Sequence, residues 1–246
     1  MLKQSTNCLF PLLSTGPKEV SNNKLSLIID TCTERSVVAL ASEAGLVHSA
    51  PLPKGFATSR HLFPAIEQLM EGISAAAELS CIIVGVGPGS YTGMRVGAAA
   101  ALALGYGWKK PVMGVTTLEG LFSSHDGRFV SVIDARMGGV YYLLGERSGE
   151  EIVFFGRPMR ASITDAISHW AGVSYAVTPH AEQLRSQIPM ALLWEEKAID
   201  PYQLHKGAQR RLAQGCGGEE MAVPRLSLEL LYLRKVQAEI DKETAK

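Results

Sequence analysis

Hydrophobic and polar positions along the first part of the chain predict three consecutive strands. Leu25-Ser-Leu-Ile-Ile-Asp30 is an apolar run of strand length that ends in an acid. A polar turn over 31–35 separates it from a β-branched run over 36–42, and Gly45 marks a hairpin connection into a third apolar stretch. Runs of this length, bounded by turn residues, are typical of strands. We therefore expect the chain to open with a three-stranded meander.

Helices and strands are predicted to alternate after this meander. An apolar stripe with helical spacing favours a helix that begins between Ser59 and Leu62. Pro64 conflicts with this helix unless it lies in the first turn, because proline removes a hydrogen bond. A buried strand over 81–87, a helix over 92–106 and a strand over 112–115 are expected to follow. Strands that alternate with helices indicate crossover connections and a mostly parallel sheet.

The second half of the chain repeats the pattern of the first. Its predicted strands span 129–134, 140–144, 152–155 and 174–178. Helices are expected after Ser162 or Thr164 and after Asp200, which precedes a proline. Asp30 and Asp134 occupy the same place in two similar units, so we predict an α/β protein of two lobes. The expected boundaries are an N-terminal extension over 1–24, a first lobe over 25–123, a second lobe over 124–235 and a charged tail over 236–246.

Composition excludes several classes of protein. The chain has 246 residues, of which 46% are hydrophobic, and its 24 basic and 24 acidic residues cancel. A protein that grips nucleic acid by itself usually carries a basic excess. The four cysteines are dispersed, which favours reduced thiols and a cytoplasmic location. No apolar run is long enough for a membrane span, and residues 8–13 are too short for the core of a signal peptide.

The glycine-rich stretch over 85–95 is the first candidate for chemistry, because such loops cradle phosphates before helices. It matches none of the usual nucleotide or nucleophile motifs. Thr92 stands where a dinucleotide fingerprint needs glycine, Pro88 stands where a nucleophile elbow on Ser90 needs glycine, and no Gly-Lys-Ser/Thr triplet occurs. The six histidines have no metal-ligand spacing, so we expect no metal site.

Two other features leave alternatives open. Asp30 and Asp134 either hold Mg²⁺ between the lobes or accept backbone N–H groups in the turns that they begin. Gly93, Gly97, Ala101 and Gly105 recur every four residues and share one face of a predicted helix. Interior glycines cost about 1 kcal/mol each in a helix, so close backbone approach is expected to offset them. This small-residue face packs either on the chain's own sheet or on a second chain.

Several of these motifs resemble the TsaB (YeaZ) family. The resemblance rests on Ile29-Asp-Thr-Cys-Thr33, the stretch from Gly85 to Gly97, Gly114-Val-Thr-Thr-Leu118, Ile133-Asp-Ala-Arg136 and Tyr232-Leu-Arg234. It implies the duplicated fold of actin, Hsp70 and sugar kinases, a ribonuclease H-like arrangement of two lobes with mixed sheets flanked by helices. The motif residues are Asp30, Thr31, Gly87, Pro88, Gly89, Ser90, Thr92, Arg95, Asp134 and Arg136.

The resemblance also implies a function. It predicts a non-catalytic partner of the transferase TsaD, joined by the ATPase TsaE, in N6-threonylcarbamoylation of the adenosine beside the anticodon in tRNAs that read ANN codons. It further implies a homodimer when the chain is alone, tRNA contact only through the complex, no cofactor of its own, and ATP and metal held by partners. The partner-binding residues it implies are His61, Leu62, Ile66, Met70, Gly93, Met94, Gly97, Ala101 and Gly105.

Two departures from the family pattern and two rival functions complete the sequence picture. Cys32 replaces the serine usual after Asp-Thr, and the first 24 residues have no family counterpart. A stand-alone kinase of the same fold needs a glycine-rich phosphate loop after the first strand, but the turn after Asp30 contains no glycine. A peptidase of the M22 type needs a metal pair or an activated nucleophile, and neither spacing is present.

Overall fold

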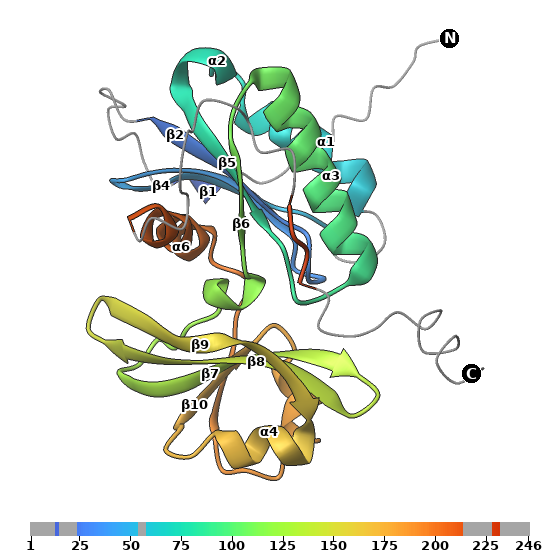
Figure 1. Ribbon diagram of the computed structural model, residues 1–246, viewed down its shortest axis with the longest axis vertical. Helices are drawn as coiled ribbons and strands as arrows, with labels where there is room; N and C mark the ends of the chain where they lie inside the picture. The colour runs from blue at the N-terminus through green and yellow to red at the C-terminus, as the bar shows by residue number, and fades with distance from the viewer. Residues whose placement is uncertain (1–12, 15–23, 54–57, 214–227, 232–246) are drawn as a thin grey trace, which may run out of the picture.

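Two mixed β-sheets, one above the other in Figure 1, form the framework of the chain. The computed structural model describes residues 13–14, 24–53, 58–213 and 228–231. The expected α/β fold with two lobes is confirmed. No helix in these ranges is long and apolar enough to cross a membrane.

The first-lobe sheet has the strand order β1-β4-β3-β2-β5-β6. Its strands are β1 (Leu13–Ser14), β2 (Leu25–Asp30), β3 (Val37–Ser42), β4 (Gly45–Pro51), β5 (Leu79–Gly85) and β6 (Val112–Val115). The meander β2-β3-β4 is antiparallel, whereas β5 pairs in parallel with β2 and β6 pairs in parallel with β5. This mixed pattern follows from the connections, because hairpins join antiparallel strands and helical crossovers join parallel ones.

The described helices that connect strands of the first lobe are α1 (Thr58–Leu69), α2 (Ala75–Glu78) and α3 (Tyr91–Trp108). In Figure 1, α1 and α3 lie on the same side of the sheet, where they bury one apolar cluster with β2, β3 and β5. Helix α1 begins before the expected Ser59–Leu62 region, so Pro64 lies inside it rather than in its first turn. Pro64 is exposed, on the side of α1 away from the sheet.

The second-lobe sheet has the order β11-β10-β7-β8-β9. Its strands are β7 (Gly127–Arg136), β8 (Gly139–Ser148), β9 (Glu151–Ser162), β10 (Tyr175–Thr178) and β11 (Leu193–Glu196). Helices α4 (Ile163–His169) and α5 (Ala181–Arg185) pack on its outer side around the fully buried Trp170. Ser162 caps α4 by accepting the Asp165 N–H at 3.1 Å, one of the two starts expected from the sequence.

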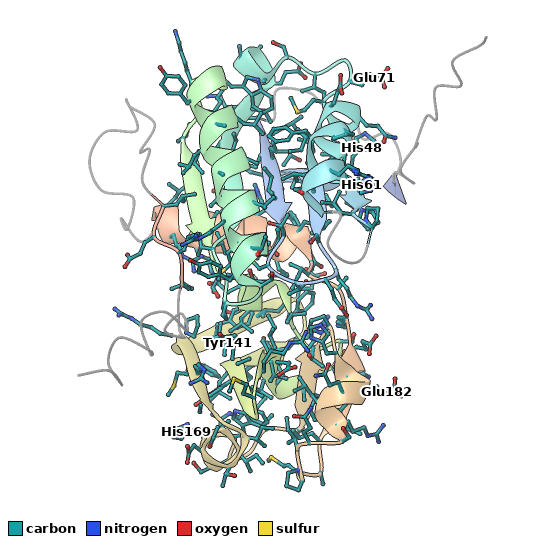
Figure 2. The ribbon with its side chains drawn as sticks, turned by 90° about the vertical axis from the view of Figure 1, so that its right-hand side faces the viewer. His48, His61, Glu71, Tyr141, His169 and Glu182 are labelled. Carbon is teal, nitrogen blue, oxygen red and sulfur yellow. The ribbon has the colours of Figure 1, made fainter. Side chains whose placement is uncertain are left out.

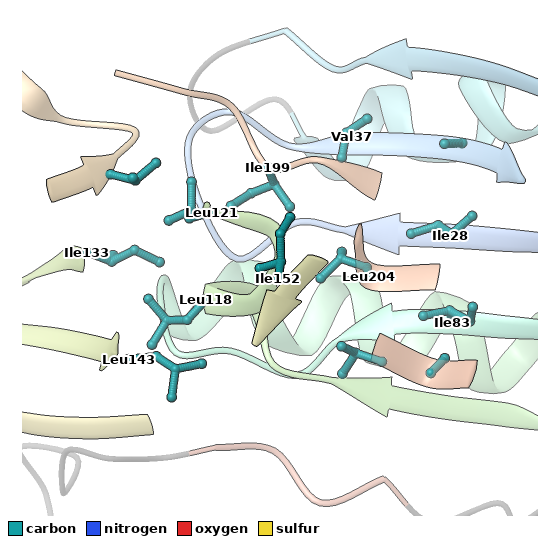
Figure 3. Packing of buried hydrophobic residues seen from close by; sticks show 14 of the residues in the cluster. Ile28, Val37, Ile83, Leu118, Leu121, Ile133, Leu143, Ile152, Ile199 and Leu204 are labelled. Atoms are coloured by element: carbon teal, nitrogen blue, oxygen red, sulfur yellow. The ribbon is translucent and has the colours of Figure 1, made fainter. Parts of the chain in front are cut away.

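A third apolar cluster joins the lobes (Figure 3). Ile28 and Ile83 from the first sheet and Ile133 from the second converge on the short 3-10 helix η1 (Thr117–Gly120) and on α6 (Pro201–Ala213). Although α6 follows the second lobe in sequence, it packs on β2 and β3 of the first. The sequence-based boundaries assigned α6 to the second lobe over 124–235. This assignment is wrong for α6, because the chain crosses back and the helix covers the first sheet.

The segments near the chain ends are described only in part. Leu13 and Ser14 pair with Ser49 and His48 of β4, so at least this part of the expected extension over 1–24 belongs to the sheet. The rest of 1–23 and the tail over 236–246 lie outside the described residues. Residues 228–231, assigned from the sequence to the second lobe, lie on the first, where the Leu231 N–H donates to the Val86 carbonyl at 2.9 Å.

Candidate functional site

The turn after β2 and the glycine-rich loop after β5 form one packed unit. Since β2 and β5 are parallel neighbours, their carboxyl ends meet at the same edge of the sheet. The Ser90 N–H donates to the Cys32 carbonyl at 2.7 Å, and the Thr31 hydroxyl donates to the Gly93 carbonyl at 2.6 Å. Ser90 also caps α3 by accepting the Gly93 N–H at 3.2 Å. The sequence motifs 29–33 and 85–97 are thus two sides of a single contact.

Close approach within the chain explains the glycines of this loop. A Cβ atom at Gly89 would lie closer than 3.0 Å to the Cys32 carbonyl oxygen, and one at Gly93 would lie as close to the Thr31 carbonyl oxygen. The Gly87 carbonyl accepts bonds from the Thr116 hydroxyl at 2.9 Å and the Thr117 N–H at 2.8 Å, and the Gly87–Pro88 peptide is cis. The space beside the loop is therefore filled by the chain's own turn.

Asp30 is buried at the centre of this unit. Its carboxylate accepts the Cys32 N–H at 2.9 Å and the Thr117 hydroxyl at 2.8 Å. Burial raises the pKa of Asp30 to about 6, although these hydrogen bonds oppose the rise. A Cβ atom at Gly85 would lie closer than 3.0 Å to the same carboxylate, so only glycine fits beside it. Both carboxylate oxygens of Asp30 are thus engaged by neighbours.

The thiol of Cys32 is held in the same buried unit. It donates to the Gly85 carbonyl at 3.2 Å. Burial raises the pKa of this thiol, and the nearby Asp30 carboxylate raises it further. A buried thiol of raised pKa is a poor nucleophile, since the thiolate is the reactive form. Cys32 therefore has a packing role at the position where the resemblance expects serine.

Asp134 makes the equivalent turn in the second lobe. Its carboxylate accepts the Arg136 N–H at 2.7 Å, as Asp30 accepts the N–H two residues ahead, and it also accepts the Gln183 side-chain amide at 2.7 Å. The sequence left two alternatives for these acids, Mg²⁺ binding or acceptance of backbone N–H groups in their turns, and both acids make the turn contacts. Among the described residues, no three His, Cys, Asp or Glu side chains group closely enough to hold a metal ion.

The turn after β2 also ties the lobes together. Arg35 forms an ion pair with Glu196 of β11, and Glu34 lies 3.3 Å from Nε2 of His180. Burial lowers the pKa of His180, while the nearby Glu34 and Asp134 carboxylates oppose the shift. No sequence signal marked these pairs, because each joins residues far apart in the chain.

Most residues that the resemblance assigned to partner binding pack inside the chain. Leu62 and Ala101 are fully buried, while Ile66 and Met94 are 3% and 4% exposed. Cβ atoms at Gly97 and Gly105 would lie closer than 3.0 Å to the Thr31 hydroxyl and to the Val112 side chain of the same chain. For these residues and Gly93, the expectation of a partner-facing side is wrong, because these sides of α1 and α3 pack against the first lobe of the same chain. His61 and Met70 are half-buried (His61 labelled in Figure 2).

The opposite sides of α1 and α3 form the outward face of the first lobe. On this outward face, Phe63 of α1 is 50% exposed, and Tyr91 and Tyr106 of α3 are 38% and 71% exposed. The Arg95 guanidinium stacks 4.0 Å from the centre of the Tyr91 ring. The sequence pattern counted Phe63 among the buried residues of its helix and gave Tyr91 and Tyr106 no role, whereas the structure exposes all three side chains.

Comparisons with known proteins agree with this architecture. The family model described as TsaD, tRNA N6-adenosine threonylcarbamoyltransferase, matches residues 56–209, more than half of the chain. The curated tRNA threonylcarbamoyladenosine biosynthesis protein TsaB of Escherichia coli is 30% identical over 58% of this chain and 64% of its own length. Its namesake in Bacillus subtilis is 35% identical over 47% of this chain and 52% of its own length. The match thus spans about half to two thirds of these relatives.

A solved structure extends the likeness to almost the whole fold. YeaZ from Pseudomonas aeruginosa superposes with a TM-score of 0.69 at 22% identity, covering 82% of this chain and 98% of that chain. This likeness shows the shared two-lobe fold. The TsaB proteins are relatives of this chain in sequence and YeaZ shares its fold, and the family model shows that the chain belongs to the TsaD family.

Proposed function

We propose that this chain is a non-catalytic subunit in the formation of threonylcarbamoyladenosine in tRNA. In this role it presents the outward face of α1 and α3 to a TsaD-type transferase, and a TsaE-type ATPase joins the pair. The names of the TsaB relatives support the pathway. In this proposal the transferase and the ATPase hold the ATP and the metal, and the chain contacts tRNA only through the complex.

The packing of the glycine-rich loop is the observation that carries the non-catalytic assignment. In a phosphate-binding loop, backbone N–H groups point at the ligand. Here the Ser90 N–H bonds to the Cys32 carbonyl, and the glycines meet the Thr31 and Cys32 backbone. The Asp30 carboxylate is likewise engaged by Cys32 and Thr117. Asp30 and Asp134 stand at equivalent places in the two lobes, and each accepts a backbone N–H in the turn that follows it.

The outward face of α1 and α3 supports the choice of contact surface. Aromatic residues are enriched at the centres of protein interfaces, and this face carries exposed aromatic side chains on both helices. Phe63 and Tyr106 are at least half exposed on neighbouring helices. The same face serves a homodimer when the transferase is absent. Because the chain has no net charge, its own tRNA affinity is weak at physiological salt.

Reconstitution with the cognate transferase, the ATPase and unmodified tRNA tests this function. The modified nucleoside, measured by mass spectrometry, is expected only when the chain and the transferase are both present. The chain alone is expected to show neither ATP turnover nor peptidase activity. Modification by the chain alone, or full modification in its absence, would overturn the proposal.

Two variants test the contact surface. Phe63→Glu and Tyr106→Glu are expected to abolish co-elution with the transferase and the dependent modification, while the melting temperature stays near that of the wild type. Leu193→Glu is the matched control, since Leu193 is 63% exposed on the other lobe. If both helix variants bind the transferase as the wild type does, the contact lies elsewhere.

A further inference from the structure

A short segment at the end of the described chain packs on the first lobe. This segment, residues 228–231, lies beside α3 and β6 in Figure 1. Leu228, Leu230 and Leu231 are half-buried against the apolar cluster of α1, α3 and the first sheet, whereas Glu229 is exposed. Helix α6 packs on the opposite face of the same sheet. The part of the chain that follows the second lobe therefore contacts both faces of the first sheet.

Two glycines make room for this segment. A Cβ atom at Gly114 of β6 would lie 3.5 Å from the Leu228 side chain and closer than 3.0 Å to the Val86 side chain. Glycine inside a strand often marks the close approach of another part of the chain. Gly87 has a φ of 100°, which other residues rarely adopt, and a Cβ atom there would lie 3.5 Å from the Leu231 carbonyl oxygen. Val86, Gly87 and Gly114 thus form a socket for the segment.

A main-chain hydrogen bond fixes the segment in this socket. The Leu231 N–H donates to the Val86 carbonyl at 2.9 Å. Val86 is 6% exposed, and buried carbonyls nearly always accept a hydrogen bond. The next carbonyl along the loop, that of Gly87, accepts from Thr116 and Thr117 instead. The segment therefore supplies the donor for the carbonyl at which the glycine-rich loop leaves β5.

The socket is continuous with the first turn of α3. A Cβ atom at Gly87 would lie closer than 3.0 Å to the Met94 sulfur, so the same glycine makes room for Leu231 and for Met94. Met94 is 4% exposed, whereas Tyr91 and Arg95 beside it are exposed on the outward face and stack on each other. Closely packed groups transmit displacements to their neighbours. The position of the segment is thus linked to the outward face through one glycine and one methionine.

We propose that residues 228–231 act as a clip on the first lobe. Docked in the socket, the clip holds the glycine-rich loop and the first turn of α3 in the arrangement that presents Tyr91 and Arg95. When the clip is released, the Val86 carbonyl loses its donor, so the loop and the turn open locally more often. The link to transferase binding rests on the proposed function, because the first turn of α3 belongs to the outward face.

Amide hydrogen exchange of the full chain, followed by NMR, tests the clip without any partner. Leu231→Pro removes the N–H that donates to the Val86 carbonyl. The Ser90 and Met94 amides of this variant are expected to exchange about tenfold faster, the factor that corresponds to the loss of one buried hydrogen bond. Amides of β7 and β8 are expected to keep their wild-type rates, which shows that the second lobe stays folded.

Two further variants separate the clip from a general disturbance of the chain end. Leu228→Ala keeps the backbone donor but removes the side chain at Gly114, and it is expected to speed exchange at Ser90 and Met94 as well. Glu229→Ala is the matched control in the same segment and is expected to change neither rate, because Glu229 is exposed. Wild-type rates in both leucine variants would overturn the proposal.

The transferase tests the link in the reverse direction. Because coupling between two sites is reciprocal, a transferase bound to the outward face is expected to slow exchange of the Leu231 amide in the wild-type chain. An unchanged Leu231 rate in a complex that has formed would overturn the link between the clip and the outward face. A chain that forms no complex would overturn the proposed function instead, and the exchange rates of the variants would then decide the clip on their own.

Discussion

Replacing Gly97 with alanine tests why the small face of α3 exists. In a solvent-exposed helix this change gains about 1 kcal/mol. At Gly97, the new Cβ atom would lie closer than 3.0 Å to the Thr31 hydroxyl, which is buried and donates to the Gly93 carbonyl. Overpacking costs about 1–3 kcal/mol, and weakening a buried hydrogen bond adds about 1 kcal/mol. The sum predicts a net loss of about 1–3 kcal/mol of stability.

Gly107→Ala in the same helix is the matched control. A Cβ atom at Gly107 meets nothing within 4 Å, so this variant is expected to gain up to about 1 kcal/mol. Urea unfolding gives both free energies directly. In a chain of this size, 1 kcal/mol shifts the melting temperature by about 2–4 °C. The same substitution should therefore shift stability in opposite directions at two positions of one helix.

A Gly97→Ala variant as stable as the wild type would refute this reasoning, because the added methyl would then have free space. The clash also predicts coupling with Thr31. Combining Gly97→Ala with Thr31→Ala removes the hydroxyl that the new methyl strikes, so the double variant should lose less stability than the two single losses added together. Strict additivity would mean that Thr31 is not the obstacle.

Three further predictions concern buried charges. Burial raises the pKa of Asp30 from 3.8 to about 6, so the stability that this group contributes is full below pH 3.8 and is lost as the pH rises through 6. A carboxyl NMR titration should show a midpoint near 6, and a midpoint near 3.8 would contradict the burial argument. Burial lowers the pKa of His205, so the stability that this group contributes is full above the ordinary pKa of 6.5 and is lost as the pH falls below that value. His205→Phe should therefore flatten the decline of the unfolding free energy on acidification. An unchanged slope would exclude His205 as the source of that decline. The side chain of Glu119 is 10% exposed and lies between Arg210 and Arg211, so Glu119→Gln should lower the free energy of unfolding by about 1–3 kcal/mol. The side chain of Glu196 is 41% exposed in its ion pair, so Glu196→Gln should lower the free energy of unfolding by less than about 1 kcal/mol. Equal losses in the two variants would contradict the argument from burial.

Local patterns were enough to predict much of the secondary structure. The strand over 25–30 matches β2 to the residue, and Ser162, one of the two cap candidates, caps α4. These features depend on interactions between residues that are close in sequence, such as a side chain that accepts a nearby N–H. The repeat of a strand ending in Asp30 and then in Asp134 likewise indicated two lobes, because each acid organises its own turn.

Non-local packing decided the remaining features. The four-residue spacing of Gly97 and Ala101 defined a face of α3, but only the tertiary structure shows that this face meets the chain's own sheet. The same holds for α6, whose sequence identifies a helix but not the lobe that it covers. The glycine-rich loop was recognisable as a motif, yet its filling by the Cys32 turn depends on residues more than fifty positions away. Periodicity fixes which side chains share a face, whereas the surface that the face meets is set by contacts between distant segments.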